Sequence, residues 1–311
     1  MVSPRALARE VPDELWHKVE ILYTSFATPL PFPEQAPHLQ WVQLYSAGAD
    51  RIVGSPLFHT SVVFTSASGV HAVSVAEYVL TMVLAWFHHV PQLREQQRLA
   101  QWPSDSERTS LFVAEELRRK TVGIVGYGSI GRQVARLADA FGMRVLAIQR
   151  RADHRDSGFL FRGVGDPEGT LPDRYYTPDQ LHQMLSESDV VLIAAPLTGE
   201  TKGLFDFAAF EAMKRTAFLV NIARSEICDE PALVAALRDH RIAGAALDVF
   251  HREPLPPEHP LWRFPNVFIS PHIAGLSPEY DRRAAIIFEE NLRRYLANEP
   301  LQNIVEKIQG Y

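Results

Sequence analysis

One stretch of the sequence, residues 121–151, constrains the fold more than any other. A β-rich run is followed by a glycine-containing turn, by a helix with apolar residues at helical spacing, and by a second apolar run. Gly126 allows a sharp turn, Gly128 allows the backbone to approach a pyrophosphate, and Gly131 allows the helix to pack close to the strand. The free N–H groups at the start of such a helix bind phosphates. The stretch therefore predicts a dinucleotide-binding unit. Its expected phosphate-binding turn consists of Gly126, Tyr127, Gly128, Ser129, Ile130 and Gly131.

The residues at the end of the second strand decide which dinucleotide fits. A site specific for NAD has Asp or Glu there to accept from the adenosine ribose, whereas the 2′-phosphate of NADP requires that acid to be absent and an arginine to be near. This chain has Gln149, Arg150 and Arg151. Because two guanidiniums can pair bidentately with a phosphate, the sequence favours NADP, with NAD as the second choice. The alternative is that both arginines are solvated surface residues beside a site that accepts either dinucleotide.

Length and composition favour two domains and exclude several classes of protein. A chain of 311 residues with 46% hydrophobic residues is too long for one ordinary domain and can form two cores. The net charge of −6 lacks the basic excess of a nucleic-acid-binding protein. The first residues lack the apolar core of a signal peptide, and no apolar run is long enough to span a bilayer. A single cysteine, Cys228, indicates a reducing compartment. We expect a cytoplasmic protein without a nucleic-acid partner, a membrane partner or a metal site.

The apolar pattern predicts an α/β fold. Strands that alternate with helices after about residue 189 indicate a doubly wound parallel sheet, and the N-terminal part reads as a smaller α/β unit that ends in a long apolar helix at 75–90. The strands expected in the large sheet after the dinucleotide unit are 190–194, 217–222, 243–249 and 267–269. Those expected in the smaller unit are 19–27, 39–44 and 62–65.

Two polar stretches interrupt this alternation. Residues 91–119 are polar and charged, and we interpret them as a crossover between domains, either an arm that lies on a partner subunit or a plain surface linker. Residues 152–176 show no periodicity and are longer than most connections in a compact domain. We expect an insertion that forms a disordered surface loop. Because it begins beside Arg150 and Arg151, the alternative is a flap that closes over the adenosine end of the cofactor.

Three polar residues, Arg224, Glu253 and His272, follow three successive strands of the predicted sheet. Ligands bind at the carboxyl ends of the strands in an open parallel sheet, so these side chains can converge beside a nicotinamide. An arginine can hold the carboxylate of a 2-oxo acid, and a histidine can give a proton to the carbonyl oxygen as hydride reaches the carbon. A glutamate beside the histidine favours imidazolium and orients the ring. Each residue alone is more often structural, so the set carries the prediction of an oxidoreductase.

From about residue 39 to the end, the chain resembles the D-isomer-specific 2-hydroxyacid dehydrogenases. The motifs that carry the resemblance have the family's order and spacing. They are Ser46–Asp50, Val75–Tyr78, Gly126–Gly131, Ala195–Thr198, Asn221–Arg224, Asp248–Pro254 and Pro271–Gly275. The resemblance implies two Rossmann-like or flavodoxin-like domains with catalysis in the cleft between them. The implied boundaries are a substrate domain at 1–93 and 287–311, to which the last helix returns, and a dinucleotide-binding domain at 94–286. A homodimer formed through 91–119 is the expected assembly.

The resemblance also assigns roles to individual residues. The family's catalytic triad falls on Arg224, Glu253 and His272, with His272 as the acid and base. The backbone at Ala47 and Gly48 would hold the substrate carboxylate together with Arg224. The remaining cofactor contacts that the resemblance implies are Pro196, Ile222, Gly275 and Asp248, the last of these binding the nicotinamide carboxamide.

Three departures from the family pattern qualify this prediction. Gln149 and Arg150 replace the usual acidic position, which resembles the NADP-preferring glyoxylate and hydroxypyruvate reductases. Ser225 stands where the family usually has glycine, so a left-handed backbone there is in doubt. The Ser46 motif comes some twenty residues early, as if the first strand and helix of the substrate domain were missing. We therefore expect a substrate domain that is shortened at its N-terminus or a start that is assigned too late.

The leading hypothesis is an NADPH-linked reductase of a small 2-oxo acid such as glyoxylate or hydroxypyruvate. A sugar-acid or phosphoglycerate dehydrogenase that uses NAD is the nearest alternative. A corepressor that senses dinucleotides and binds protein partners is an alternative from another class. A cofactor-binding protein with a damaged substrate site is a third, since the first strand and helix of the substrate domain look absent.

Overall fold

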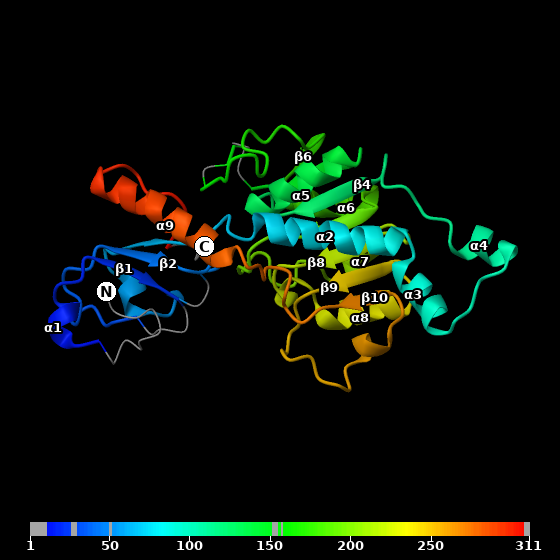
Figure 1. Ribbon diagram of the computed structural model, residues 1–311, viewed down its shortest axis with the longest axis horizontal. Helices are drawn as coiled ribbons and strands as arrows, with labels where there is room; N and C mark the ends of the chain where they lie inside the picture. The colour runs from blue at the N-terminus through cyan, green and yellow to red at the C-terminus, as the bar shows by residue number, and fades with distance from the viewer. Residues whose placement is uncertain (1–10, 26–29, 50–51, 151–154, 157, 308–311) are drawn as a thin grey trace. The chain divides into compact units, whose positions relative to one another are not determined.

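The computed structural model divides the chain into two compact units (Figure 1). It describes residues 11–25, 30–49, 52–150, 155–156 and 158–307. Unit 1 is formed by Met1–His71, Ser157–Arg162 and Leu276–Tyr311, and unit 2 by Ala72–Asp156 and Gly163–Gly275. The domain boundaries expected from the sequence, after residues 93 and 286, lie further along the chain than these.

The boundary after residue 71 follows from the packing of the first long helix, α2 (Ala72–Phe87). Val75, Val79 and Val83 of this helix are buried in the same core as Val134, a residue of the helix that follows the glycine turn. An apolar stripe of this length must pack against another element, and it does so on the sheet of unit 2. The long helix therefore belongs to the dinucleotide-binding part of the chain.

Unit 2 is built on a seven-stranded parallel sheet with the order β6-β5-β4-β7-β8-β9-β10. The chain adds strands first on one side of β4 and then, from β7 onward, on the other side. In such a sheet, ligands bind at the carboxyl edge where the strand order reverses, here between β4 and β7. The strands are β4 (Thr121–Val125), β5 (Arg144–Ile148), β6 (Arg174–Tyr176), β7 (Val190–Ile193), β8 (Phe218–Asn221), β9 (Gly244–Leu247) and β10 (Val267–Ile269). The predicted doubly wound α/β fold is confirmed.

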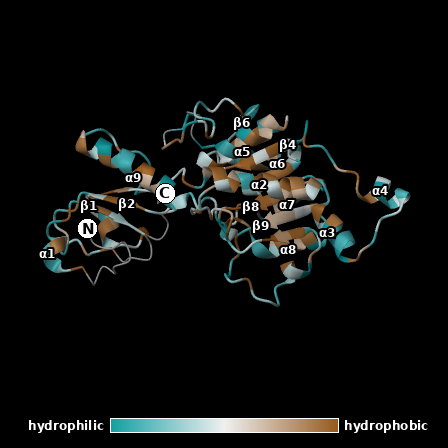
Figure 2. Ribbon diagram, viewed as in Figure 1, coloured by the Kyte–Doolittle hydropathy of each residue, from teal (hydrophilic) through white to brown (hydrophobic). Residues whose placement is uncertain are grey.

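Helices cover both faces of this sheet. Helices α2 and α5 pack on one face and α6, α7 and α8 on the other (Figure 1). Along β7, Val190 and Leu192 belong to the core beneath α2 and α5. Val191 and Ile193 belong to the core beneath α6, α7 and α8. Because both faces are buried, the strands are apolar throughout and appear mostly brown in Figure 2. The helices are α5 (Ser129–Ala140), α6 (Leu181–Glu187), α7 (Phe207–Ala212) and α8 (Glu230–Arg238).

The stretch between α2 and β4 contains two helices instead of a plain linker. They are α3 (Val90–Arg98) and α4 (Asp105–Leu111). Helix α4 lies apart from the sheet in Figure 1, and neither helix has a buried residue. Ser104 and Glu107 form a capping box, which explains why such a polar sequence begins a helix here.

Unit 1 contains a three-stranded parallel sheet with the order β1-β2-β3. Its strands are β1 (Ile21–Thr24), β2 (Trp41–Leu44) and β3 (Val63–Thr65). The last helix, α9 (Tyr280–Leu296), belongs to this unit, as expected from the sequence. Beyond α9 the chain pairs antiparallel with β3 through Thr65 and Ile304, so that it covers this edge of the sheet.

The remaining elements are short. They are α1 (Asp13–Trp16) and the 3-10 helices η3 (Pro56–His59), η4 (Pro178–Gln180), η5 (Ser225–Ile227) and η6 (Pro260–Arg263).

Within the described ranges, no single helix has both the length and the apolar composition needed to cross a bilayer; α2 and α3 meet those criteria only as a pair, with a bend of 65° between them.

Candidate active site

The glycine turn after β4 has the geometry of a phosphate-binding loop. Gly126 has φ of +103°, and a Cβ on it would lie 2.4 Å from the Ala195 nitrogen at the end of β7. A Cβ on Gly131 would lie 2.4 Å from the Gly126 carbonyl oxygen, so both positions require glycine. Around Gly128, in contrast, no heavy atom lies within 4 Å of such a Cβ. The open space is therefore at the glycine where a pyrophosphate would approach, and the site fits a dinucleotide.

The side chain of Tyr127, in the same turn, is buried. Its hydroxyl donates to Asp166 Oδ2 at 2.7 Å, and the Arg132 guanidinium lies over its ring. Burial, followed by the hydrogen bond to Asp166, raises the pKa of Tyr127 well above its usual range. The two remaining residues of the turn, Ser129 and Ile130, begin α5 directly after Gly128. The helix N-terminus thus adjoins the open side of the turn.

At the end of β5, the structure describes two of the three residues predicted to select the dinucleotide. The Gln149 nitrogen donates to the Tyr176 carbonyl at 3.2 Å. Arg150 Nη1 lies 3.0 Å from Glu200 Oε2 in an exposed ion pair. Arg151 lies outside the described residues. The acid beside Arg150 comes from another loop of unit 2. No local pattern predicts this pair, because 50 positions separate its partners.

Pro196 and Ile222 follow β7 and β8 at the carboxyl edge of the sheet. The Pro196 carbonyl accepts from Thr201 Oγ1 at 2.7 Å, which orders the turn after β7. The Ile222 nitrogen lies 3.4 Å from the Ile193 carbonyl, and its side chain packs against the core of α2 and α5. Pro196 thus follows β7, the neighbour of β4, and Ile222 follows β8, the next strand along the sheet. This is the side of β4 on which we expect the cofactor cleft.

Glu253 and His272 are brought together at the same edge. Glu253 Oε2 lies 2.9 Å from His272 Nδ1, and Glu253 Oε1 accepts from the Phe250 nitrogen at 3.0 Å. Burial alone would raise the pKa of Glu253, but the hydrogen bonds from His272 and Phe250, with the charge of Arg224, lower it on balance. Side chains from two loops therefore form a paired acid and imidazole, half exposed to solvent.

Asp248, at the end of β9, holds the loop that carries His272. Its oxygens accept from the nitrogens of Ile273 and Ala274, both at 2.9 Å, and from Ser270 Oγ at 2.5 Å. The carboxylate is 2% exposed. His272 itself has φ of 55°, a left-handed conformation that costs a residue with a Cβ on the order of 1 kcal/mol. The hydrogen bonds from Ile273 and Ala274 to Asp248 stabilise this backbone conformation. Gly275 directly follows these two residues.

The sequence did not indicate that Tyr78 and Ser270 belong to this network. The Tyr78 hydroxyl lies 2.6 Å from Ser270 Oγ, which in turn donates to Asp248. Burial raises the pKa of Tyr78. Because 192 positions separate Tyr78 from Ser270, no local pattern could have joined them.

Arg224 precedes η5 and has an extended backbone, with φ of −140° and ψ of 142°. Ser225 begins this 3-10 helix, so the position does not require the left-handed backbone of a glycine. Asn221 fixes the turn, since its side chain accepts from the Ala223 nitrogen at 3.1 Å and donates to the Arg224 carbonyl at 3.2 Å. The charge of Arg224 is the smallest of the causes that lower the pKa of Glu253.

In unit 1, Ala47 and Gly48 lie in the loop after β2. The Ser46 hydroxyl donates to the Gly48 carbonyl at 3.0 Å, and the Ala67 nitrogen donates to the Ser46 carbonyl at 2.9 Å. These contacts order the backbone at Ala47 and Gly48, which we expect to hold a substrate carboxylate. Among the residues that the structure describes, no group of three or more His, Cys, Asp or Glu side chains is placed to hold a metal ion.

Comparison with known proteins gives consistent results for sequence and structure. Residues 80–274 match the profile of the D-isomer specific 2-hydroxyacid dehydrogenase, NAD binding domain. A glyoxylate reductase of Thermofilum pendens is 36% identical over 277 residues, which are 88% of this chain and 77% of that protein.

Two solved structures share this fold. A D-isomer specific 2-hydroxyacid dehydrogenase from Xanthobacter autotrophicus Py2, in complex with NADPH and MES, is 31% identical with a TM-score of 0.76, and the match covers 93% of this chain and 85% of that one. An NADPH-dependent glyoxylate/hydroxypyruvate reductase from Sinorhizobium meliloti, in complex with NADP and sulfate, is 26% identical with a TM-score of 0.75, covering 93% and 86%.

Proposed function

The chain belongs to the D-isomer specific 2-hydroxyacid dehydrogenase family, a family of NAD(P)-dependent oxidoreductases, and from this premise we propose that it reduces glyoxylate or hydroxypyruvate with NADPH. The hydrogen-bonded pair of Glu253 and His272 at the carboxyl edge of the sheet carries the proposal. The glyoxylate reductase of Thermofilum pendens and the NADPH-dependent reductase of Sinorhizobium meliloti support the choice of substrate.

In this proposal each polar residue has one task. The dinucleotide, when bound, supplies the hydride that reaches the carbonyl carbon of the 2-oxo acid. The Arg224 guanidinium binds the substrate carboxylate, together with the backbone N–H groups of Ala47 and Gly48. His272 Nδ1 donates to Glu253 Oε2, which leaves Nε2 as the ring atom that gives its proton to the carbonyl oxygen. The product is the 2-hydroxy acid, and the imidazole takes up a new proton from solvent.

The remaining assignments concern the cofactor. The phosphates would lie on the turn at Gly128 and the start of α5, where the structure leaves open space. We propose that Asp248 and Gly275 belong to the nicotinamide end, with Asp248 also ordering the His272 loop. Pro196 and Ile222 would line the cleft. At the adenosine end, Gln149, Arg150 and Arg151 would bind the 2′-phosphate of NADP.

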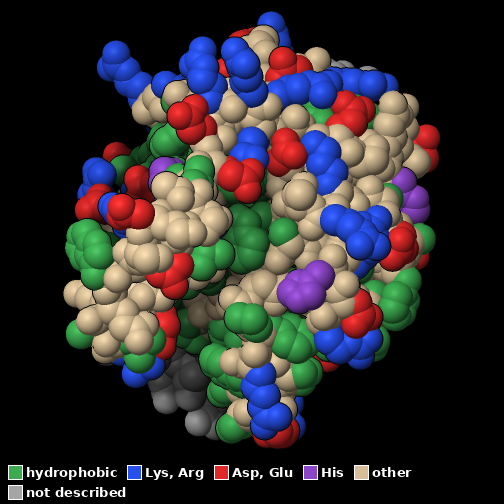
Figure 3. All heavy atoms as spheres, turned by 90° about the vertical axis from the view of Figure 1, so that its right-hand side faces the viewer, with side chains coloured by type: hydrophobic (Ala, Val, Ile, Leu, Met, Phe, Trp, Pro, Cys, Tyr) green, Lys and Arg blue, Asp and Glu red, His purple; other side chains and the backbone are tan. Residues whose placement is uncertain are grey.

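We also propose a homodimer formed through the arm that contains α3 and α4. Residues on this arm expose large apolar side chains, a composition that suits a subunit interface. Hydrophobic side chains lie among the charged ones on this side of unit 2 (Figure 3). They are Val90, Leu93, Leu99, Trp102, Leu111 and Val113.

The proposal is tested by initial rates with glyoxylate and hydroxypyruvate, each with NADPH and with NADH, on the wild type and an Arg150→Ala/Arg151→Ala variant. Loss of charged hydrogen bonds to the 2′-phosphate should lower kcat/KM for NADPH about 10- to 100-fold. The rate with NADH, which has no such phosphate, should change less than about twofold.

Arg238→Ala is the matched control, because Arg238 is also exposed and paired with an acid, Asp239. It should leave both cofactors unaffected. Equal rates of the wild type with NADPH and NADH would rule out the phosphate clamp and keep the reductase. Absence of turnover with either 2-oxo acid and either cofactor would rule out the substrate proposed here.

A further inference from the structure

The insertion between β5 and β6 does not behave as a surface loop of unit 2. Its middle part, residues 158–162, belongs to unit 1 although the chain before and after it belongs to unit 2. We call residues 158–162 the strap tip. The insertion therefore contributes to the same unit as the loop with Ala47 and Gly48.

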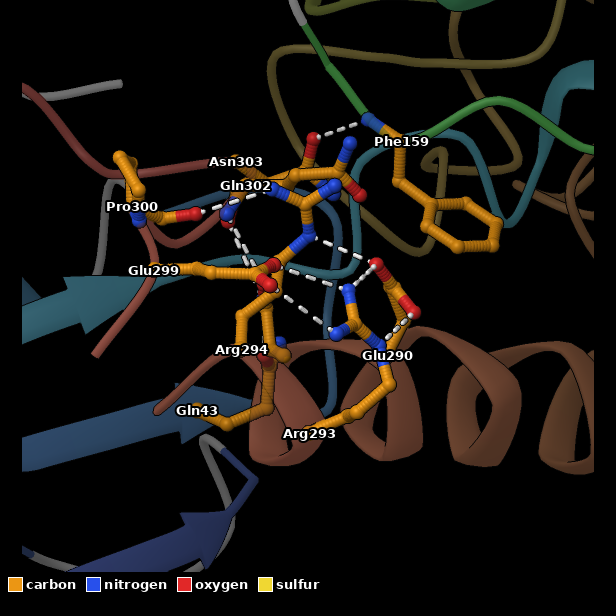
Figure 4. Close-up of polar contacts among 10 residues, drawn as sticks. Gln43, Phe159, Glu290, Arg293, Arg294, Glu299, Pro300, Gln302 and Asn303 are labelled. Carbon is orange, nitrogen blue, oxygen red and sulfur yellow. Dashed lines mark hydrogen bonds and ion pairs between the residues drawn. The ribbon is translucent and has the colours of Figure 1, made fainter. Parts of the chain in front are cut away.

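Two backbone contacts hold the strap tip. The Phe159 nitrogen donates to Asn303 Oδ1 at 2.9 Å (Figure 4). The Asn303 side chain donates in turn to the Ser66 and Ser68 carbonyls. On the other side, a Cβ on Gly69 would lie 2.9 Å from the Phe159 carbonyl oxygen, and Gly69 has φ of +98°. The backbone of Phe159 thus approaches a place where only glycine fits.

The C-terminal segment that carries Asn303 is itself well fixed. Figure 4 shows Arg293 and Arg294 of α9 paired with Glu290, and Arg293 also paired with Glu299. The Asn291 side-chain amide donates to the Gln302 carbonyl and accepts from the Gln302 nitrogen. Asn303 is therefore a rigid acceptor for the strap tip.

The rings of the strap tip pack on a small apolar cluster of unit 1. Phe159 and Phe161 contact each other edge to face, with centroids 4.9 Å apart. Both pack against a buried group formed by Ala67, Val70, Ala284 and Ile287. Ala284 and Ile287 of this group belong to α9, and the group is separate from the main core of the unit.

The same cluster supports the loop that we propose as the substrate-carboxylate site. Tyr45, Ala47 and Tyr280 pack against it together with the strap tip. The Tyr280 hydroxyl donates to the Tyr45 carbonyl at 2.8 Å, and Ala67 donates to the Ser46 carbonyl. Packing of the strap tip and order of the loop therefore depend on the same few side chains.

The ends of the insertion are anchored in unit 2, on the helix that follows the glycine turn. Arg132, 2% exposed, donates to the Asp166 carbonyl at 2.6 Å, and Gln133 Oε1 accepts from the Gly165 nitrogen at 2.6 Å. Two residues separate Gly165 from Arg162, the last of the strap tip. The anchor and the strap tip are thus distinct parts of one short segment, and a change in the strap tip leaves the anchor in place.

We propose that the strap tip positions the loop 45–48, with Phe159 as the positioning residue. This inference rests on the proposed function, in which that loop binds the substrate carboxylate. Removal of the Phe159 ring leaves the loop in its binding-competent conformation for a smaller fraction of the time. The apparent affinity for the 2-oxo acid falls by that fraction. The affinity for the dinucleotide does not change, because the bonds of Arg132 and Gln133 in unit 2 remain.

The test compares Phe159→Ala and Phe161→Ala with a conservative Phe159→Leu variant. Phe159→Ala should raise KM for glyoxylate about fivefold and leave kcat and the Kd of NADPH, from fluorescence titration, within about twofold. Phe159→Leu should restore most of the wild-type KM because it keeps apolar volume. Phe161→Ala, which removes the neighbouring ring, should act in the same direction and serves if Phe159→Ala does not fold.

Phe288→Ala is the matched control, since Phe288 is also in unit 1 and stacks on Tyr23 instead of the cluster. Hydrogen exchange of the amides at 45–48 should accelerate in Phe159→Ala and not in Phe288→Ala. Unchanged KM and unchanged exchange in Phe159→Ala would overturn the inference, as would equal effects in Phe288→Ala. A wild type that reduces no 2-oxo acid contradicts the proposed function instead, and the exchange comparison then decides the inference.

Discussion

At the scale of the residue, the conformation of His272 depends on Asp248. A buried carboxylate accepts from two consecutive backbone nitrogens of the His272 loop and from Ser270. Glu253 orients the ring from another loop through Nδ1. Asp248 therefore fixes the backbone of the His272 loop, and Glu253 fixes the His272 ring. Replacement of Glu253 should change the proton transfer by the ring and leave the loop backbone in place.

Replacement of Glu253 by Gln should lower kcat for glyoxylate reduction roughly 10- to 100-fold, because the imidazole loses the charged acceptor that orients it and favours its proton. The Kd of NADPH should change less than about twofold, since the variant leaves the Asp248 bonds in place. Steady-state rates and fluorescence titration measure both. Glu258→Gln removes an exposed acid of the same loop and is the control. A kcat that stays at the wild-type value would exclude the role proposed for Glu253.

At the scale of the element, two arginines of α9 join the helix to the segment that follows it, and Glu290 orients both. Arg293 Nη2 pairs with Glu299 of that segment at 3.0 Å. Glu290 accepts from Arg294 Nε at 2.7 Å and from Arg293 Nη2 at 3.0 Å, and Arg294 Nη1 donates to the Pro300 carbonyl. The hydrogen bonds from Arg293 and then Arg294 lower the pKa of Glu290 to about 2. This clamp holds the segment that carries Asn303.

Glu290→Gln should lower Tm at neutral pH by about 1 to 3 °C, as expected for a partly exposed ion pair. Because the folded pKa lies below the ordinary value, the unfolded chain binds the proton first as pH falls. The Tm difference from the wild type should thus shrink between about pH 4.5 and pH 2 and be small below it. Glu289→Gln, an exposed neighbour, should show no such trend in thermal melts. A constant difference across this range would contradict the clamp.

The elements whose pattern is local can be predicted from the sequence. The large sheet follows from its apolar runs, and Arg224, Glu253 and His272 lie at its carboxyl edge because parallel strands end on one side. The strands deviate from their expected bounds by a few residues, as in β9, which is shorter than 243–249.

What the sequence missed depends on contacts between distant positions. The insertion is anchored through Tyr127 and Asp166, which are 39 positions apart, and its tip bonds Asn303, 144 positions from Phe159. The pattern of residues 152–176 therefore suggested a disordered surface loop, which is wrong for its described part. Helix α4 was missed because a polar sequence of seven residues shows no apolar stripe.

At the scale of the whole molecule, the polar arm with α3 and α4 exposes several large apolar side chains. Trp102 is 87% exposed and Leu111 60% exposed. Large apolar side chains at this exposure on one segment suit burial against a second copy of the chain.

A Trp102→Asp/Leu111→Asp variant should therefore change the mass measured by light scattering from two chains to one, because charge at the centre of an apolar interface is costly. Phe207→Asp changes an aromatic residue on α7 that is 59% exposed, close to the exposure of Leu111, and should leave the mass at two chains. A wild-type protein that is already monomeric would exclude the proposed dimer.

The antiparallel pairing of the C-terminal segment with β3 has a consequence for biosynthesis. Unit 1 needs α9 and Ile304 to complete its sheet edge, so it cannot finish folding until these residues leave the ribosome. The core of unit 2 is complete once Gly275 has been translated and can fold while translation continues. After β3 ends at Thr65, its free edge therefore stays unpaired until the chain has been translated to Ile304. During that interval a chaperone, or a neighbouring nascent chain, can occupy the edge that Ile304 later covers.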